Sequence, residues 1–125
     1  MSDSAKRVLV VDDDPDILLV LVSLLEEAGY EVSTAEQRDD LVQLSRLGEG
    51  ELPDLIVLDL YLSGKDSSQA ARQLKAHDTT RRIPILMLSA HPDAAREAKD
   101  AGADGFLPKP FDLDMLLTTI GAFFV

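Results

Sequence analysis

The chain alternates between short apolar runs and longer segments in which apolar residues recur at helical spacing. Some of the short runs, such as residues 8–11 and 55–58, are apolar at every position, which is typical of strands buried on both faces of a parallel sheet. The strands that this pattern predicts are residues 8–11, 30–34, 55–59, 85–88 and 106–108. Each is followed by a segment of helical periodicity, so the sequence predicts five βα units.

The helices of these units have recognisable starts and stops. The first begins at Asp14 and Pro15 and stops before Gly29, because proline suits the first turn of a helix and glycine its end. The others are predicted over residues 38–47, from a cap at Ser67 or Ser68 through Leu74, over residues 93–101, and from a cap at Asp112 through Ile120. Since helices that connect parallel strands cover both faces of the sheet, we expect an α/β fold with a doubly wound parallel sheet and five helices.

Length, composition and charge limit the classes of function. The 125 residues, 46% of them apolar, are enough for one core, so we expect residues 1–125 to form a single domain without an output domain. The absence of cysteine excludes a disulfide framework and a thiolate nucleophile or metal site. The net charge of -11 disfavours direct binding of nucleic acid. No signal-peptide core or membrane span is present, so we expect a cytoplasmic location.

Chemically active side chains stand at the carboxyl ends of four predicted strands. Asp12 and Asp13 follow the first strand, Asp59 ends the third, Ser89 follows the fourth and Lys109 follows the fifth. Because the carboxyl ends of parallel strands lie along one edge of a sheet, we expect these side chains to converge. Three carboxylates repel one another and lose solvation on burial unless a cation neutralises them. An all-oxygen site favours Mg²⁺, and we expect Mn²⁺ to substitute.

The same residues favour phosphoryl transfer. A carboxylate can accept a phosphoryl group as an aspartyl phosphate, and Asp59 is placed to do so. Ser89 and Lys109 can donate hydrogen bonds to phosphoryl oxygens. For any single acid a structural interpretation is simpler, because Asp13 or Asp14 can cap the first helix and Asp59 can lie in an exposed turn. The hydroxyl and the ammonium at the same edge favour the phosphoryl-transfer site.

Four motifs, residues 8–15, 53–60, 85–90 and 102–111, occur in the order and spacing of a known family. In these motifs, and over nearly its whole length, the chain resembles the receiver domain of two-component response regulators. The resemblance implies a flavodoxin-like sheet with the strand order 2-1-3-4-5, which right-handed crossovers also allow. It implies a signal-transduction module of a two-component system or phosphorelay. Such a module receives a phosphoryl group from a histidine kinase or histidine phosphotransfer protein and switches a surface that binds a downstream protein.

The resemblance also implies a role for each acid. Asp59 is the implied phosphoacceptor. Asp13, Asp59 and the backbone carbonyl of Tyr61 are implied to bind Mg²⁺ directly, and Asp12 to bind it through water. Such a domain catalyses only its own phosphorylation and dephosphorylation, so we do not expect an enzyme acting on other substrates.

Further implied roles concern the hydroxyl, the lysine and one aromatic ring. Ser89 and Lys109 are implied to hold the phosphoryl oxygens, and movement of Ser89 toward them is implied to draw the ring of Phe106 inward. Taken alone, Phe106 is equally explained as a core residue. The peptide bond between Lys109 and Pro110 is implied to be cis, a tolerable cost before proline.

The chain departs from the family pattern at the residues that flank the site. Tyr61, two positions after Asp59, and His91, two positions after Ser89, stand where the family often has polar residues. We expect the ring of Tyr61 to obstruct the attacking water and slow dephosphorylation; the alternative is that both rings lie on the surface without effect. The last helix lacks the arginine with which transcription-factor receivers often form dimers, so we expect a monomer or a weak dimer.

Two other classes remain alternatives. A metal-dependent phosphohydrolase also uses an aspartate nucleophile, but it needs a second acid beside that nucleophile and a substrate cap, and the chain has Tyr61 at that position and no cap-sized insertion. A nucleotide- or flavin-binding module needs a glycine-rich first loop, and this loop is acidic. The receiver interpretation is the one that uses all of the strand-end residues.

Overall fold

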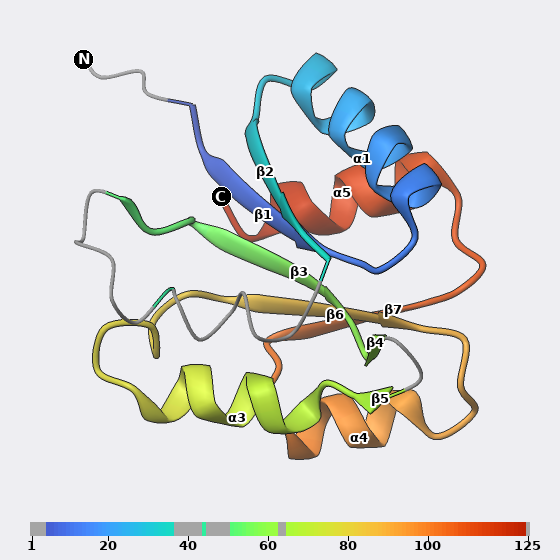
Figure 1. Cartoon of the computed structure of the whole chain (residues 1–125). Helices are drawn as coiled ribbons and strands as arrows, with labels where there is room; N and C mark the ends of the chain where they lie inside the picture. The colour runs from blue at the N-terminus through green and yellow to red at the C-terminus, as the bar shows by residue number, and fades with distance from the viewer. Residues whose placement is uncertain (1–4, 37–43, 45–50, 63–64, 125) are drawn as a thin grey trace.

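The sheet lies at the centre of the molecule and consists of five parallel strands (Figure 1). The computed structural model describes residues 5–36, 44, 51–62 and 65–124. The strands are β1 (Arg7–Val11), β2 (Glu31–Ala35), β3 (Leu55–Asp59), β6 (Ile85–Ser89) and β7 (Gly105–Pro108). Their order is β2-β1-β3-β6-β7, which confirms the order 2-1-3-4-5 and places β1 beside β3.

Helices cover both faces of the sheet, as a doubly wound fold requires. Helices α1 (Pro15–Glu27) and α5 (Leu113–Ala122) lie on one face, and α3 (Ser68–Ala76) and α4 (Ala94–Asp100) lie on the other (Figure 1). The described residues thus contain four of the five predicted helices. The predicted helix over residues 38–47 falls outside them, apart from the buried Leu44. No helix in the described ranges has the length and apolarity that a membrane span needs.

Alternate residues of the central strands supply two separate cores. The core against α1 and α5 is built from Val8, Val10, Leu55, Val57, Leu86 and Leu88 of the strands, with Leu18, Leu21, Leu25, Leu107, Leu116 and Ile120. The core against α3 and α4 is built from the intervening residues Leu9, Val11, Ile56, Leu58, Ile85 and Met87, with Ala71, Leu74, Ala94 and Ala98 among others. A strand that feeds both cores must be apolar at every position, which explains the runs in the sequence.

Polar residues fix the ends of α1 and α5 as predicted. The Asp14 carboxylate accepts a hydrogen bond from the Asp16 N–H at 2.9 Å, and Asp112 accepts from the Met115 N–H at 2.7 Å. Helix α1 ends at Glu27 and is followed by Ala28 as its C-cap and by Gly29, whose φ of 99° lies in the left-handed region that favours glycine. The predicted serine cap of α3 is wrong: Ser67 is the N-cap residue but makes no side-chain cap hydrogen bond, and its buried hydroxyl has no partner among the described residues.

Other predicted boundaries shift for local reasons. Strand β2 starts one residue later than predicted, because the Tyr30 N–H still bonds to the Leu25 carbonyl at the end of α1. Helix α4 is one residue shorter at each end than the predicted 93–101. The structure also contains a small antiparallel pair, β4 (Tyr61–Leu62) and β5 (Lys65–Asp66), which was not predicted because strands of two residues carry no periodicity.

Candidate functional site

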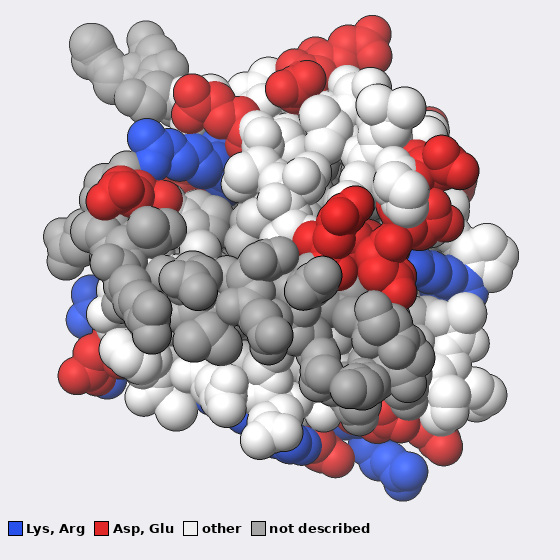
Figure 2. All heavy atoms as spheres, viewed as in Figure 1, with Lys and Arg blue, Asp and Glu red and all other residues white. Residues whose placement is uncertain are grey.

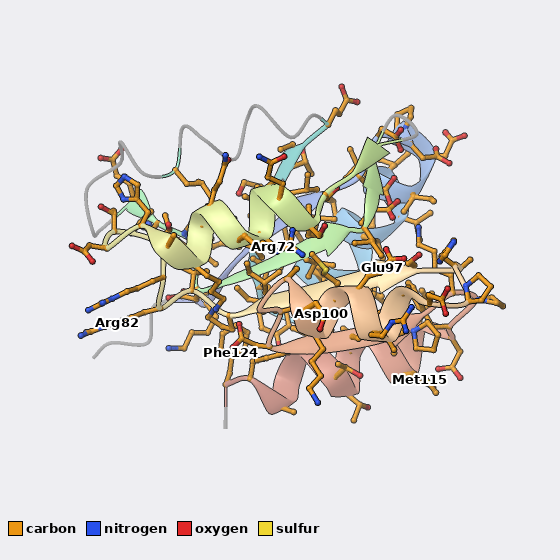
Figure 3. The ribbon with its side chains drawn as sticks, turned by 90° about the horizontal axis from the view of Figure 1, so that it is seen from below. Arg72, Arg82, Glu97, Asp100, Met115 and Phe124 are labelled. Carbon is orange, nitrogen blue, oxygen red and sulfur yellow. The ribbon has the colours of Figure 1, made fainter. Side chains whose placement is uncertain are left out.

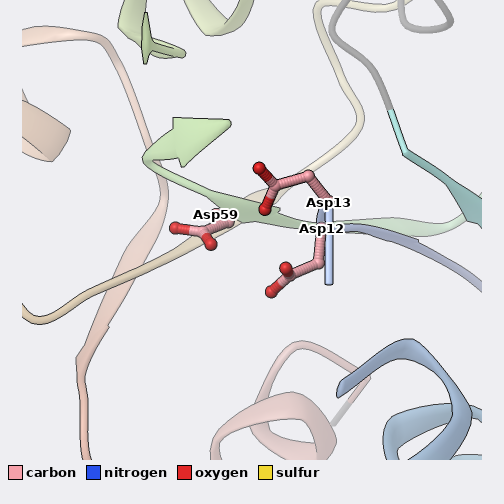
Figure 4. Close-up of side chains that lie close together, drawn as sticks. All are labelled: Asp12, Asp13 and Asp59. Atoms are coloured by element: carbon pink, nitrogen blue, oxygen red, sulfur yellow. The ribbon is translucent and has the colours of Figure 1, made fainter. Parts of the chain in front are cut away.

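Three carboxylates meet at the carboxyl end of the sheet. Asp12 and Asp13 follow β1 and Asp59 ends β3, and one carboxylate oxygen of each lies within 4.8 Å of the others (Figure 4). Asp12 is 2% exposed and Asp59 9%, whereas Asp13 is exposed. Figure 2 shows that acidic side chains also gather on the outer surface around the turn from β1 into α1.

The strand register produces this meeting. Val11 of β1 pairs with Leu58 of β3, so the next residues of both strands, Asp12 and Asp59, reach the same edge. The Asp12 N–H continues the ladder on the other side by donating to the Ala35 carbonyl at 3.1 Å. The prediction that these acids converge is therefore confirmed by the backbone pairing itself.

Asp12 is the most deeply buried of the three acids. Its Oδ1 accepts a hydrogen bond from the Asp14 N–H at 2.9 Å, but its buried Oδ2 has no hydrogen-bond partner among the described residues. Burial raises the pKa of the Asp12 carboxyl, the Asp14 N–H opposes that rise, and the Asp59 charge adds to it. A buried oxygen with this environment is the kind of atom that a bound cation or its water would satisfy.

Lys109 is the cation of the site. Its Nζ donates to Asp59 Oδ2 at 3.2 Å and lies 3.7 Å from Asp12 Oδ2, too far for a hydrogen bond. Its backbone N–H donates to the Ser89 carbonyl at 2.9 Å, which fixes the backbone beside β6. The bond between Lys109 and Pro110 is cis, as expected. One ammonium among three acids leaves the edge net negative, which suits a divalent cation.

Ser89 ends the central strand β6 and is 3% exposed. Its Oγ accepts a hydrogen bond from the His91 N–H at 3.0 Å. This bond uses a lone pair of the hydroxyl oxygen and leaves the O–H hydrogen free to donate. The edge thus offers carboxylates, an ammonium and a hydroxyl donor, which is the set predicted from the sequence.

The family model of the response regulator receiver domain matches residues 8–121 of the chain. The chain belongs to this family. It is a phosphoacceptor signalling module, and the phosphohydrolase alternative is not favoured. Receiver domains act with histidine kinases or phosphotransfer proteins and bind Mg²⁺ in an acidic cleft, which corresponds here to the aspartate cluster.

Similar proteins include both short and long members of the family. Protein PilH of Pseudomonas aeruginosa is 36% identical over 118 residues, which are 93% of this chain and 95% of PilH. The structure of chemotaxis response regulator CheY4 of Vibrio cholerae superimposes with a TM-score of 0.84 at 29% identity and covers 96% of this chain and 99% of CheY4. The chain spans about half the length of other curated relatives, which are transcriptional regulators.

One solved structure bears on the metal. The receiver domain of sensor histidine kinase PA1611 from Pseudomonas aeruginosa has a magnesium ion coordinated in its active-site cleft. This receiver domain matches it with a TM-score of 0.82 at 27% identity, over 96% of this chain and 98% of that one.

Two further predicted residues of this receiver domain are Tyr61 and Phe106. Tyr61 follows the site in β4, where its backbone pairs with that of Asp66. Phe106 lies half-buried in β7, in register with Met87, and packs against the core below α3 and α4. The position of Phe106 fits a core residue and also fits a switch residue, so its role stays a prediction.

A groove beside the site was not predicted from the sequence. It runs between α1 and the start of α5 and has a volume of about 460 Å³. It is lined mainly by apolar atoms of Ile17, Val20, Leu21, Pro110, Phe111 and Leu113, and Asp16 and Lys109 also line it. Leu19, Val20, Leu113 and Met115 on the same helices are between 43% and 68% exposed. The signal was present in the chain, because these residues are apolar yet lie off the buried stripes of α1 and α5.

Proposed function

We propose that Asp59 is the residue of this receiver domain that accepts the phosphoryl group. The observation that carries the proposal is its position: Asp59 ends a fully buried central strand, lies among the acids, and has the Lys109 ammonium 3.2 Å from Oδ2. Asp12 is more deeply buried than Asp59, and Asp13 is exposed to solvent. Asp59 alone combines the ammonium contact with a place beside the Ser89 strand.

The transfer itself needs few protein groups. A carboxylate oxygen of Asp59 forms a bond to phosphorus while the bond from phosphorus to the donor breaks, and the donor leaves with the electron pair of that bond. Charge develops on the phosphoryl oxygens during the transfer. The Lys109 ammonium and the Ser89 hydroxyl then donate to these oxygens, which stabilises the charge without rearrangement of either strand.

The residues fit a Mg²⁺ ion, and Mn²⁺ in its place. Asp13, Asp59 and the Tyr61 carbonyl are the proposed direct ligands, with Asp12 acting through water. Support comes from the all-oxygen set and from the unpartnered Oδ2 of Asp12. When bound, the cation supplies positive charge that offsets both the acids and the incoming phosphoryl group.

The output of the module is a switched surface on α4, β7 and α5. Ser89 and Phe106 are the proposed switch residues, since β6 and β7 pair directly and a phosphoryl group adds charge and acceptors that can bias a two-state element. Magnetic resonance shifts on phosphorylation are expected over residues 89–105 as well as around Asp59. Shifts confined to α1 and to the predicted second helix, residues 38–47, would contradict this switch.

The partner that supplies the phosphoryl group is a histidine kinase or histidine phosphotransfer protein. The apolar groove between α1 and α5 supports docking of a helix of that partner, because Lys109 of the site is one of the residues that line it. Acidic residues such as Asp16 and Asp114 stand on the same helices, so the docked helix is expected to carry basic residues. This exchange takes place in the cytoplasm, where kinases draw on ATP.

Intact mass tests the phosphoacceptor. The protein is incubated with Mg²⁺ and a small phosphodonor such as acetyl phosphate, and one retained phosphoryl group is expected in the wild type and none in Asp59→Asn. Asp54→Asn is the matched control, because Asp54 precedes the same strand at its other end and bonds to the Arg7 N–H. Retention by Asp59→Asn would overturn the assignment, and rapid donor turnover without retention would revive the hydrolase alternative.

A further inference from the structure

The first turn of α4 is capped by a histidine rather than by its N-cap residue. Asp93 occupies the N-cap position but makes no side-chain cap hydrogen bond. Instead, the Asp93 N–H donates to His91 Nδ1 at 3.2 Å and the Ala94 N–H donates to the His91 carbonyl at 3.1 Å. His91 therefore satisfies two of the backbone donors that a helix leaves open at its start.

The ring nitrogen that forms this cap also faces an acid. His91 Nδ1 lies 3.6 Å from Glu97 Oε1, and Glu97 stands on the first turn of α4, where Figure 3 labels it. Nδ1 accepts the Asp93 N–H only while it carries no proton, and it attracts Glu97 only when it carries one. One nitrogen cannot do both, so protonation exchanges the cap for the ion pair.

The cap is joined to the phosphorylation site by a single residue. The backbone N–H of His91 donates to Ser89 Oγ at 3.0 Å, so the turn that presents the ring also holds the hydroxyl oxygen. While both hydrogen bonds are present, the one from the His91 N–H to Ser89 Oγ and the one from the Asp93 N–H to the His91 ring, the turn keeps the Ser89 hydroxyl in one orientation. When the bond from Asp93 is lost, the turn holds the hydroxyl less firmly.

The charged groups around the ring come from several elements. Helix α4 contributes Glu97 and the exposed Asp93, and the side chain of His91 is itself 42% exposed. The strands on either side of β6 contribute Asp59 and Lys109, which lie 3.2 Å from each other. Of the side chains that the structure describes, Glu97 is the one within ion-pair distance of the imidazole.

We propose that His91 is a positioning residue whose protonation loosens the cap of α4 and with it the Ser89 hydroxyl, which makes phosphorylation sensitive to pH. This inference deepens the proposed function and rests on it. An imidazole changes charge between about pH 5 and 8, so the neutral ring holds the observed geometry and the protonated ring releases it. Phosphorylation is slower where His91 is protonated.

Magnetic resonance titration tests the cap without any phosphorylation. The proton resonances of the His91 ring and the Asp93 amide are followed against pH, with His77, the chain's other histidine, as the internal reference. The Asp93 amide is expected to shift together with the His91 ring. If the resonance of the Asp93 amide does not change with pH together with that of the His91 ring, the proposal is overturned.

Kinetics test the link to Ser89 through two substitutions. His91→Asn keeps an acceptor for the Asp93 N–H but does not titrate, whereas His91→Ala removes the acceptor. The ratio of wild-type to His91→Asn phosphorylation rates cancels the pH dependence of donor, metal and acids. We expect this ratio to be near one at about pH 8 and about threefold lower at about pH 5, and His91→Ala to be slow at both values. A ratio that stays constant overturns this inference, whereas failure of every form to retain a phosphoryl group overturns the proposed function.

Discussion

The two ends of the sheet compensate charged side chains in different ways. At the amino ends of β6 and β7, the Lys75 ammonium donates to Asp104 Oδ2 at 2.6 Å and to the Ile83 carbonyl at 3.0 Å, and Asp104 Oδ2 also accepts the Ile85 N–H at 2.9 Å. At the carboxyl end, Lys109 reaches Asp59 at 3.2 Å, and Oδ2 of Asp12 is left without a hydrogen bond among the described residues.

This difference separates a structural ion pair from a ligand site. The charges of Lys75 and Asp104 are matched one to one and each also bonds to the backbone, so the pair ties α3, β6 and β7 together. At the other end three acids share one ammonium, which lowers stability in the metal-free protein. A fold keeps such an arrangement where a ligand completes it.

The largest expected effect comes from binding Mg²⁺ at the aspartate cluster, at the carboxyl end of the sheet. Mg²⁺ should raise the free energy of unfolding by about 2.7 kcal/mol at a hundredfold excess over its dissociation constant, because it binds only the folded state. Asp13→Ala should abolish both this gain and phosphorylation, since it removes a proposed direct ligand. Thermal melts with and without millimolar Mg²⁺, and intact mass, measure the two effects. If Mg²⁺ does not change the melting temperature of the wild type, the proposed metal site is wrong.

The next effect comes from removing the ion pair between Lys75 and Asp104 at the amino end of the sheet. Lys75→Met should lower the free energy of unfolding by about 2 kcal/mol, because the Ile83 carbonyl and the Asp104 carboxylate lose a charged donor. Arg81→Met is the control: Arg81 pairs with Asp78 at 3.6 Å on the open surface, where an ion pair contributes less than about 1 kcal/mol. Chemical denaturation measures both variants, and Mg²⁺ binding should be unchanged in either. If both variants lose the same free energy of unfolding, the Lys75–Asp104 pair contributes no more than a surface ion pair, and the proposed difference between the two ends is wrong.

The aspartate cluster at the carboxyl end of the sheet was predicted from the sequence, whereas the ion pair at the amino end was not. Asp12 and Asp59 each follow an apolar run, and register alone brings strand ends together, so position in the chain sufficed. Lys75 and Asp104 lie 29 residues apart in a helix and a loop, and only the packing of α3 against the start of β6 brings them together. Contacts that depend on the packing of one layer on another leave no pattern in the sequence.

Local turn geometry limited the prediction in the same way. Asp112 was predicted as a cap and acts as one, because an acid directly before a helical stripe is a strong signal. Ser67 gave the same signal and does not cap, because its N–H bonds back to the Leu60 carbonyl and its φ and ψ of -89° and 2° depart from the extended conformation of a capping residue. At α4 the N-cap residue Asp93 also departs from the extended conformation, with φ and ψ of -98° and 9°, and its carboxylate makes no cap hydrogen bond. The His91 ring accepts the Asp93 N–H instead.

A smaller effect tests how open the acid end is to water. Tyr61 stands two residues beyond Asp59, and its ring is expected to obstruct the water that would attack the aspartyl phosphate. Tyr61→Asn should speed dephosphorylation about tenfold, a barrier change of roughly 1.4 kcal/mol. The decay of the phosphorylated protein, followed by intact mass after the donor is removed, measures it. Unchanged decay in both Tyr61→Asn and His91→Ala would show that neither ring controls the water.

The smallest effect concerns Asp12, whose buried Oδ2 has no hydrogen-bond partner among the described residues. Burial raises the pKa of Asp12 in the folded protein, so between the ordinary carboxyl range and neutrality the folded state binds more protons than the unfolded state. The contribution of Asp12 to stability is therefore fully present below its unfolded pKa and is lost as pH rises through its folded pKa. Asp12→Asn removes this loss and should make the metal-free protein about 1 kcal/mol more stable at neutral pH.

Urea unfolding in the presence of a chelator measures this effect at acid and neutral pH. The advantage of Asp12→Asn over the wild type should grow as pH rises and should shrink when Mg²⁺ is added, because the cation compensates the wild-type carboxylate. Asp54→Asn serves as the control: Asp54 accepts the Arg7 N–H at 2.8 Å, an asparagine oxygen can still accept it, and this variant should show no such advantage. If Asp12→Asn instead destabilises the metal-free protein at neutral pH, the carboxylate is stabilised by the fold and the two ends of the sheet do not differ in kind.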